Sequence, residues 1–356
     1  MNYAVIMAGG AGTRLWPISR ERLPKPALRL YSDKSMFQIA VERLAPLFTP
    51  QQVIVVAGAG HTAVLAEQVP EIPSENFIVE PEGRGTAAAI ALTAVHLAAR
   101  DSNAVMAVLT ADHFIGNEAA FRDSVAAALT AAKSDYLVTL GISPEFPSTE
   151  YGYIQQGKLL DEIGGFQVLE AKRFVEKPDI DRAREMVQAG NYSWNSGMFI
   201  WKVSVILEEF SRQMPELFDQ ITRIGKTVNT SEYAGTLSEI WPNIRKQTID
   251  YGIMEGARRV VVLPVAMQWA DVGNWSSLKA LLPADPNGNT IKGDATLLDC
   301  SGTLLFGGQR LIAGVGLKDL VIVDTPDALL ICRMDRVQDV RKIAESLKAN
   351  GRLDLI

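Results

Sequence analysis

The sequence contains few of the side chains that build nucleophilic or zinc-dependent active sites. Its 356 residues include only two cysteines and three histidines. Cys300 and Cys332 lie far apart in apolar surroundings, so we expect buried, reduced thiols. None of His61, His96 and His113 has ligand spacing to another histidine or to a cysteine. These absences argue against a Cys-His or Ser-His-Asp nucleophile and against a zinc centre.

Long hydrophobic runs and an excess of basic residues are also missing. Hydrophobic residues make up 47% of the chain, but no apolar stretch approaches the roughly 18–20 residues that span a bilayer. The start, Met1-Asn2-Tyr3, has no charged region typical of a signal peptide. Lysine and arginine total 35 against 41 acidic residues, which argues against a nucleic-acid surface. We therefore expect a cytoplasmic protein that binds neither membrane nor nucleic acid, with a small anion as its partner.

The opening segment, by contrast, combines glycine with positive charge. An apolar run from Tyr3 to Met7 leads into Ala8-Gly9-Gly10-Ala11-Gly12-Thr13. Glycines allow backbone N–H groups to approach phosphate oxygens closely. The following residues carry five cations and one acid: Arg14, Arg20, Arg22, Lys25, Arg29 and Glu21. This arrangement predicts a buried strand that opens into a cradle for a polyphosphate.

Spacing separates this loop from two other phosphate-binding glycine loops. A Walker loop requires G-x-x-x-x-G-K-[ST], and no Lys-Ser or Lys-Thr follows at the required place. A dinucleotide fingerprint requires G-x-G-x-x-G at the start of a helix. Gly10 and Gly12 satisfy its first half, but Leu15 replaces the third glycine and Pro17 breaks any helix. A dinucleotide-dependent oxidoreductase is therefore a distant alternative.

Apolar strands alternate with helical stretches through the first part of the chain. The predicted strands after the first are Val53–Ala57, Ala104–Leu109 and Tyr136–Leu140, and the predicted helices are Met36–Leu47, Thr86–Arg100 and Glu118–Lys133. Short, continuous apolar runs are typical of parallel strands that are buried on both faces. The pattern predicts an α/β fold with a doubly wound, mixed but mostly parallel sheet.

After Pro283 the composition changes to short β-like pieces separated by glycines, followed by a helical stretch over Val337–Lys348. We interpret residues 284–356 as a small β-rich C-terminal domain, for which a fragment of β-helix is one interpretation. It would serve either packing within the chain or subunit contact in a homodimer, and the residues leave this open.

Two aspartates from distant parts of the chain could hold a metal ion. Asp112 follows the apolar run that ends at Leu109, so it emerges at the carboxyl end of a strand, where open α/β sheets place their ligands. Asp271 lies in Trp269-Ala270-Asp271-Val272-Gly273-Asn274-Trp275. A pair of carboxylates suits Mg²⁺, which takes its remaining ligands from phosphate and water. We expect Asp112 and Asp271 to bind Mg²⁺, the expected cofactor.

The glycine segment resembles the signature of a known enzyme family. Its pattern G-G-x-G-T-R-L, followed by the lysine of Pro24-Lys25-Pro26, is similar to the sugar-1-phosphate nucleotidylyltransferases, and Leu15-Trp16-Pro17-Ile18-Ser19-Arg20 is similar to their mannose-1-phosphate guanylyltransferase branch. The resemblance covers about residues 3 to 282. It implies a Rossmann-like, glycosyltransferase-A-like catalytic domain over residues 1–283, with a nucleotide-binding part over about 1–145 and a sugar-binding lobe over about 146–283.

The implied reaction is transfer of GMP from GTP to mannose 1-phosphate, which yields GDP-mannose and pyrophosphate. Arg14, Lys25 and Asp112 are the expected catalytic residues: Arg14 for the departing phosphates, Lys25 for the α-phosphate and sugar phosphate, and Asp112 for the metal. The expected nucleotide-binding residues are Ala8, Gly9, Gly10, Gly12, Thr13, Arg14, Glu80, Gly85, Thr86 and Asp112. The expected sugar-phosphate-binding residues are Tyr151, Gly152, Glu176, Lys177, Asn195 and Asp250.

Alternatives remain open at this point. The same chemistry could use another hexose 1-phosphate or another nucleoside triphosphate, because small changes around Asn195 or Glu80 could redirect either pocket. A catalytically silent, nucleotide-sugar-binding regulatory paralogue would retain the fold, although the intact Arg14, Lys25, Asp112 and Asp271 argue against it. Many longer relatives carry a fused mannose-6-phosphate isomerase domain. The sequence has no room for one, so we do not expect isomerase activity.

Overall fold

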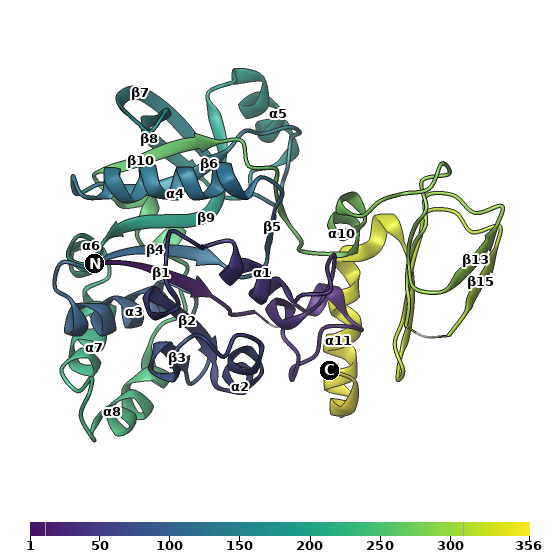
Figure 1. The fold of residues 1–356 in the computed structure, drawn as a ribbon, viewed down its shortest axis with the longest axis horizontal. Coiled ribbons are helices and arrows are strands. Elements are labelled where there is room, and N and C mark those ends of the chain that lie inside the picture. The colour runs from purple at the N-terminus through teal and green to yellow at the C-terminus, as the bar shows by residue number, and fades with distance from the viewer. Residues whose placement is uncertain (11, 309) are drawn as a thin grey trace.

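A computed structural model of the chain describes residues 1–10, 12–308 and 310–356. A nine-stranded sheet lies at its centre, and a smaller β-rich domain extends from one end (Figure 1). In spatial order the central strands are β3 (Phe77–Glu80), β2 (Val53–Gly58), β1 (Asn2–Met7), β4 (Val105–Thr110), β9 (Tyr192–Lys202), β6 (Leu137–Ile142), β10 (Val260–Val265), β8 (Phe166–Val175) and β7 (Tyr153–Ile163). Only β8 and β9 run against the other strands, which confirms the mixed, mostly parallel sheet.

The first strands end together at one edge of the sheet. In the parallel register Met7 lies between Val56 of β2 and Thr110 of β4. The polar residues that follow β1 and β4 therefore emerge side by side, at the edge where open α/β sheets place ligands. The glycine loop after β1 and Asp112 after β4 are brought together in this way.

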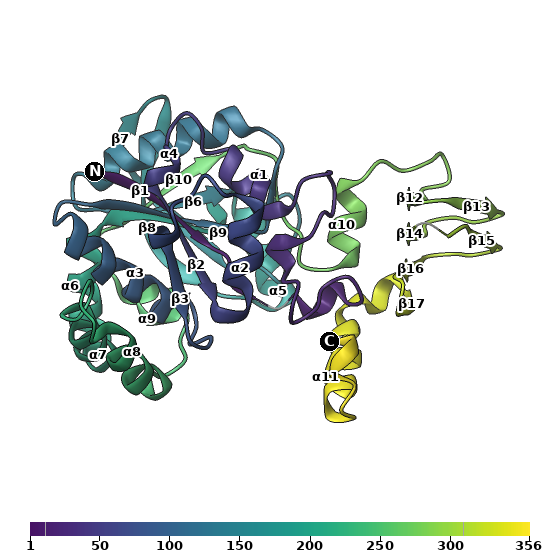
Figure 2. The same cartoon turned by 60° about the horizontal axis from the view of Figure 1, so that its bottom comes forward.

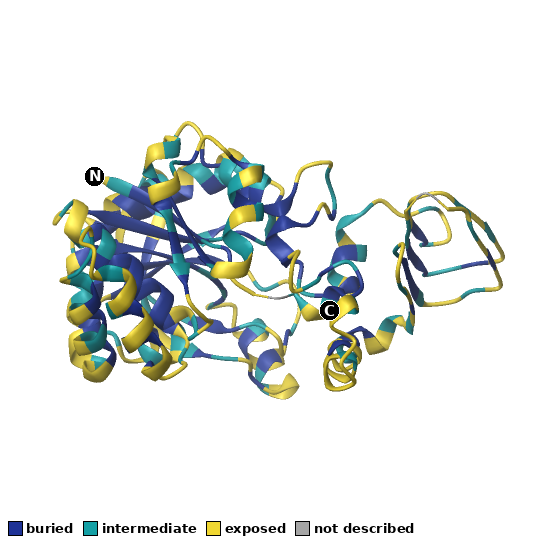
Figure 3. Ribbon diagram, turned by 90° about the horizontal axis from the view of Figure 1, so that it is seen from below, coloured by how far each residue is buried: buried dark blue, intermediate teal, exposed yellow. Residues whose placement is uncertain are grey.

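Helices cover both faces of the sheet, as a doubly wound fold requires (Figure 3). The helices of this part are α1 (Met36–Glu42), α2 (Ala59–Gln68), α3 (Thr86–Arg100), α4 (Glu118–Ala132), α5 (Ile180–Ala189), α6 (Val203–Gln213), α7 (Pro215–Gly225), α8 (Tyr233–Ile240), α9 (Ile249–Gly252) and α10 (Trp275–Leu281). One face of the sheet packs against α1, α2 and α4, and the other packs against α3 and α6 to α9. In the described part of the chain no helix combines the length and the apolar character needed to cross a bilayer.

The helix α1 ends earlier than the sequence pattern indicates. A capping box at Ser35 begins it as expected, but it stops at Glu42 instead of reaching Leu47. Pro46 explains the difference, because a proline disfavours helical backbone at the residue before it and has no N–H to donate. By contrast, α3 has the predicted bounds, since its small apolar residues are almost all buried between the sheet and α6 and α7.

A two-stranded antiparallel ribbon lies beside the sheet. It consists of β5 (His113–Ile115) and β11 (Trp269–Asp271). The central strands β6 to β10 lie between these two strands in the sequence. Asp271 pairs directly with His113, the residue after Asp112. This ribbon is what carries the second aspartate to the first.

The C-terminal domain is built from stacked, mostly parallel strands (Figure 2). One sheet has the order β12 (Thr290–Lys292), β14 (Leu304–Phe306), β16 (Leu320–Asp324) and β17 (Leu329–Arg333), and a second pairs β13 (Ala295–Leu298) with β15 (Ile312–Val315). Among the described strands of this domain, only β17 runs antiparallel to its neighbour. A 3₁₀ helix, η7 (Met334–Asp339), leads into α11 (Val340–Ala349). The predicted β-rich domain with a terminal helix is confirmed, although the first part of the predicted helix is 3₁₀.

The two domains share a core of their own. Leu15, Trp16 and Trp275 from the large domain are buried together with Val321 and Val340 from the C-terminal domain. Trp275 Nε1 donates to the carbonyl of Trp16 at 3.1 Å, and Trp16 Nε1 donates to the carbonyl of Leu355 at 2.7 Å. The segment around Leu15 and Trp16 is therefore held in place by packing and hydrogen bonds with residues from the C-terminal part of the chain.

Candidate active site

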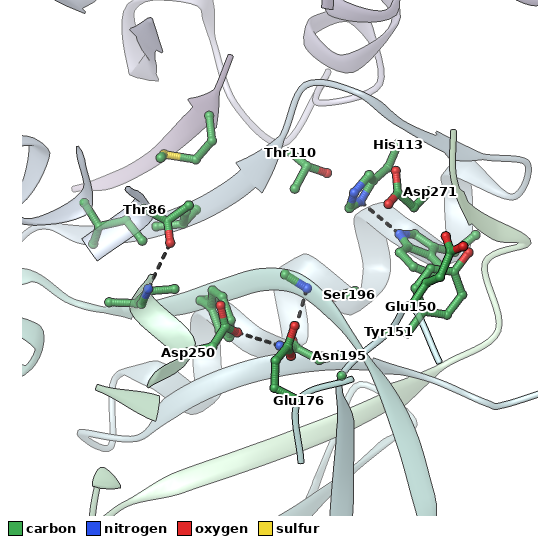
Figure 4. Close-up of a pocket in the computed structure, with 18 residues that line it drawn as sticks. Thr86, Thr110, His113, Glu150, Tyr151, Glu176, Asn195, Ser196, Asp250 and Asp271 are labelled. Carbon is green, nitrogen blue, oxygen red and sulfur yellow. Dashed lines mark hydrogen bonds between the residues drawn. The ribbon is translucent and has the colours of Figure 1, made fainter. Parts of the chain in front are cut away.

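A cavity of about 240 Å³ opens at the carboxyl edge of the sheet (Figure 4). Of the predicted binding residues, it brings together Thr86, Tyr151, Gly152, Glu176, Asn195, Asp250 and Asp271. These residues come from distant parts of the large domain, between positions 86 and 271. The backbone N–H of Ile249 donates to Thr86 Oγ1 at 2.9 Å, so this hydroxyl also ties α9 to the start of α3.

Aromatic rings form one wall of the cavity. The ring of Tyr151 meets those of Trp194 and Trp269 edge to face, with centroids 5.0 and 5.2 Å apart. Burial raises the pKa of the Tyr151 hydroxyl to about 12, so it stays protonated at neutral pH. Trp269 Nε1 donates to His113 Nδ1 at 3.0 Å, and burial holds the pKa of His113 below its ordinary value. The lowered pKa favours the neutral ring, whose hydrogen is then on Nε2 because Nδ1 accepts from Trp269.

The end of the cavity away from the glycine loop is acidic and tightly packed. Asn195 Nδ2 donates to Asp250 Oδ1 at 2.6 Å, and the N–H of Gly197 donates to Asn195 Oδ1 at 3.1 Å. Burial, together with nearby Glu176, raises the pKa of Asp250. A Cβ at position 152 would clash with Glu176 Oε2, so glycine there leaves room for this carboxylate. The arrangement presents carboxylates and an amide, which are suited to bind hydroxyl groups.

Lys25 joins the two predicted metal-binding aspartates. Its ammonium lies 2.7 Å from Asp112 Oδ2 and 3.3 Å from Asp271 Oδ1, and its side chain is only 8% exposed. Burial disfavours the charge, but the two carboxylates outweigh this effect and raise the pKa of Lys25. The pKa of Asp112 is lowered by Lys25, although its burial acts in the opposite direction. Both aspartates thus share one cationic partner, and Asp271 also lines the cavity.

The glycine segment curves around Lys25. Gly12 adopts a left-handed backbone with φ of 61°, and a Cβ there would lie 2.7 Å from the Cβ of Lys25. Ser19 Oγ donates to the carbonyl of Gly12 at 2.6 Å and closes the turn. Ala11, part of the predicted phosphate cradle, lies outside the described residues. Arg14 follows in η1 (Thr13–Leu15), and its Nη2 lies close to Gly273, two residues after Asp271.

Many of the predicted residues do not line the cavity: Ala8, Gly9, Gly10, Gly12, Thr13, Arg14, Lys25 and Asp112 lie outside its lining, as do Glu80, Gly85 and Lys177. Lys177 has 63% of its side chain exposed and forms an ion pair with Glu176 at 2.9 Å. Gly85 precedes α3 with φ of 86°, and a side chain there would collide with the carbonyl of Gln247, so its role in the structure is to allow this contact. Glu80 is buried at the end of β3. Their predicted roles in binding stay predictions.

Burial of Glu80 gives a prediction about pH. Burial raises its pKa from the ordinary 4.5 to about 7, so its protonated form contributes stability that is complete below pH 4.5 and is lost as the pH rises through 7. We expect Glu80→Gln to raise the melting temperature relative to wild type at pH 8.5 and to leave it nearly unchanged at pH 5. In the free energy of unfolding, the effect of the substitution should differ between the two pH values by on the order of 3 kcal/mol. Thermal unfolding at both pH values tests this. The exposed Glu71→Gln is the control, and equal effects of Glu80→Gln at both pH values would contradict the prediction.

Several lining residues were not predicted from the sequence. Thr110 could have been predicted, because it ends an apolar strand two residues before Asp112. In the described structure its Oγ1 is buried without a hydrogen-bond partner. Glu150 and Trp269 adjoin residues that were singled out, but nothing in their own sequence context indicates the cavity. Among the described residues, no cluster of three or more histidine, cysteine, aspartate or glutamate side chains could hold a metal. The site therefore offers two carboxylates and one ammonium.

Comparison with known proteins agrees with this geometry. The Nucleotidyl transferase family matches residues 3–287, and the MannoseP isomerase/GMP-like beta-helix domain matches residues 293–347. The chain is 38% identical to a mannose-1-phosphate guanylyltransferase of Klebsiella pneumoniae, covering 98% of this chain and 74% of that protein. It is also 38% identical to the alginate biosynthesis protein AlgA of Pseudomonas aeruginosa, covering 98% and 72%.

A solved structure is similar along the whole chain. A crystal structure from Thermus thermophilus, described as a mannose-1-phosphate geranyltransferase, superposes with a TM-score of 0.86 at 35% identity, covering 98% of this chain and 99% of that one. The match includes both the large sheet and the β-rich domain. This chain belongs to the nucleotidyl transferase family, in the branch of the mannose-1-phosphate guanylyltransferases.

Proposed function

We propose that this protein transfers GMP from GTP to mannose 1-phosphate and releases pyrophosphate. The observation that carries the proposal is the convergence of Lys25 and Asp112 on Asp271, which lines a cavity that Glu176 and Asp250 also line. Cationic groups face the place for phosphates, and carboxylates face the place for hydroxyls. A sugar phosphate and a nucleotide can therefore meet between the two ends.

The reaction does not need a protein nucleophile. An oxygen of the sugar phosphate attacks the α-phosphorus of GTP in line, and pyrophosphate leaves. Arg14 would neutralise the departing phosphates, and Lys25 would reduce the repulsion between the α-phosphate and the attacking phosphate. The rate acceleration then comes from alignment and from charges that are already in place.

The donor set fits the expected Mg²⁺. Asp112 and Asp271 already share one cationic partner, the ammonium of Lys25, so the position between them accommodates positive charge. Mg²⁺ commonly takes only one or two protein carboxylates. In this site these two aspartates would hold it, and the bound ion would stabilise negative charge on the phosphates. Lys25 would then turn its ammonium from the aspartates toward phosphate.

One assay tests the function. Purified protein, Mg²⁺ and mannose 1-phosphate are combined with each of the four nucleoside triphosphates, and pyrophosphate release is measured. We expect release with GTP. A second series with other hexose 1-phosphates at fixed GTP tests the sugar. Equal or higher release with another nucleotide or another sugar would replace that part of the proposal, and no release in any combination would favour a regulatory protein.

Gly152 offers a prediction for the sugar end. Gly152→Ala introduces a Cβ that collides with Glu176 Oε2, so the carboxylate must move away from its position in the cavity. We expect KM for mannose 1-phosphate to rise about tenfold, the cost of one displaced polar contact, while KM for GTP changes little. Steady-state kinetics in both substrates measures this. Gly235→Ala, on the exposed face of α8 with no atom within 4 Å of the added Cβ, is the control, and a rise confined to GTP would contradict the assignment.

A further inference from the structure

A glutamine from the C-terminal domain reaches the active site. Gln338 lies in the 3₁₀ helix η7, between the buried residues Val337 and Val340 of the shared core. Arg14 Nη1 donates to Gln338 Oε1 at 3.3 Å, and Gln338 Nε2 donates to Glu150 Oε1 at 2.5 Å. Gln338 is thus the link between the arginine of the signature segment and a carboxylate that lines the cavity.

The chemistry of this link favours a neutral amide. A guanidinium only donates hydrogen bonds, and an ionised carboxylate only accepts them. The amide supplies one acceptor for Arg14 and one donor for Glu150, so both contacts are satisfied in a single orientation. It also stands between two opposite charges. Without it, Arg14 could pair directly with Glu150, and its charge would be neutralised within the protein.

The position of Gln338 is fixed from both sides. Val337 and Val340 are 5% and 1% exposed and pack in the core that also contains Leu15, the residue after Arg14. The next residue, Asp339, forms ion pairs with Arg336 and Lys342 on its own helical segment. The backbone that carries Gln338 is therefore held against the segment that carries Arg14.

We propose that Gln338 is a positioning residue for Arg14: it holds the guanidinium apart from Glu150 and aimed at the β- and γ-phosphates of the nucleotide. This inference rests on the proposed function, because Arg14 acts on the departing pyrophosphate in that reaction. It assigns the C-terminal domain a part in catalysis, since a group outside the large domain orients a charge inside it.

The test compares forward and reverse kinetics. Gln338→Leu keeps a side chain of similar size but removes both hydrogen bonds. In the reverse reaction, with GDP-mannose and pyrophosphate, we expect KM for pyrophosphate to rise about tenfold or more and KM for GDP-mannose to change less than about twofold. In the forward reaction kcat/KM for GTP should fall by a similar factor, and KM for mannose 1-phosphate should stay near wild type. Asp335→Asn, an exposed change on the same 3₁₀ helix, is the control.

A charge exchange separates positioning from a merely structural role. Gln338→Glu still accepts from Arg14 but faces Glu150 with a second negative charge, so we expect a comparable loss. Adding Glu150→Gln places an amide donor opposite the introduced carboxylate, and the double variant should recover KM for pyrophosphate to within about threefold of Glu150→Gln alone. Melting temperatures of all variants are measured in parallel, and the double variant carries the test if Gln338→Leu does not fold.

Two results would overturn the inference while the proposed function stands: a normal KM for pyrophosphate in Gln338→Leu, or no recovery in the double variant. If wild-type protein shows no exchange between GDP-mannose and pyrophosphate, the proposed function fails and the inference fails with it. The wild-type measurement therefore distinguishes the two failures.

Discussion

Replacement of Asp112 by asparagine is expected to slow turnover by about 10²–10³-fold, the usual cost of losing one preorganised electrostatic group. The substitution keeps the shape of the side chain and removes its charge. It therefore leaves Lys25 with Asp271 as its only carboxylate partner at hydrogen-bonding distance in the described structure. The same change removes one of the two oxygen donors proposed for Mg²⁺. We also expect the Mg²⁺ concentration at half-maximal rate to rise.

Single-turnover rates across a Mg²⁺ series measure both effects. Asp123→Asn changes an exposed aspartate on α4 in the same way and serves as the matched control. Near-normal turnover of Asp112→Asn at wild-type Mg²⁺ concentrations would remove Asp112 from the catalytic group. A slow rate with an unchanged Mg²⁺ dependence would keep its catalytic role and contradict its role as a metal ligand.

Replacement of Lys25 by methionine should affect both activity and stability. Lys25 is buried between Asp112 and Asp271, so its removal leaves two carboxylates without their shared cation. Loss of one partner from a fully buried charge pair costs about 3–5 kcal/mol, and the cost here is smaller because the side chains of Asp112 and Asp271 are 24% and 34% exposed. We therefore expect a clear drop in the melting temperature at pH 7, together with a fall in turnover of about 10²–10³-fold or more.

A second substitution separates the two losses. In Lys25→Met with Asp112→Asn, one of the two opposing negative charges is also removed, so much of the lost stability should return. Turnover should not return, because both catalytic groups are absent. Thermal unfolding and pyrophosphate release, measured on the two single variants and the double variant, test this. Stability effects that simply add would show that Lys25 does not hold the carboxylates together, and recovered turnover would show that it has no catalytic role.

The local sequence predicts most of the elements of the sheet and part of its order. Continuous apolar runs such as Val53–Ala57 identify parallel strands that are buried on both faces, and the helix over Thr86–Arg100 follows from its small apolar residues. The insertion of β9 between β4 and β6, antiparallel to both, could not be predicted. It depends on packing between segments that are distant in the sequence, and no local pattern carries that information.

The candidate site divides in the same way. The rule that ligands lie at the carboxyl ends of strands leads to Asp112 from the sequence alone. The resemblance to a family led to Glu176 and Asn195, which the structure places in one cavity. The meeting of Asp271 with Lys25 depends on the ribbon of β5 and β11, whose strands have only three residues each. Gln338 had no signal at all, because a single glutamine at the start of a helical stretch is ordinary.

The core shared by the two domains bears on when this protein becomes active during its synthesis. The signature segment around Leu15 and Trp16 leaves the ribosome long before its buried partners Val321 and Val340. Domains commonly fold as they emerge, N-terminal parts first. The large sheet can therefore form early, while Arg14 still lacks the residues that orient it. A nascent chain that ends before Val321 would then contain the folded sheet but would bind the nucleotide phosphates poorly.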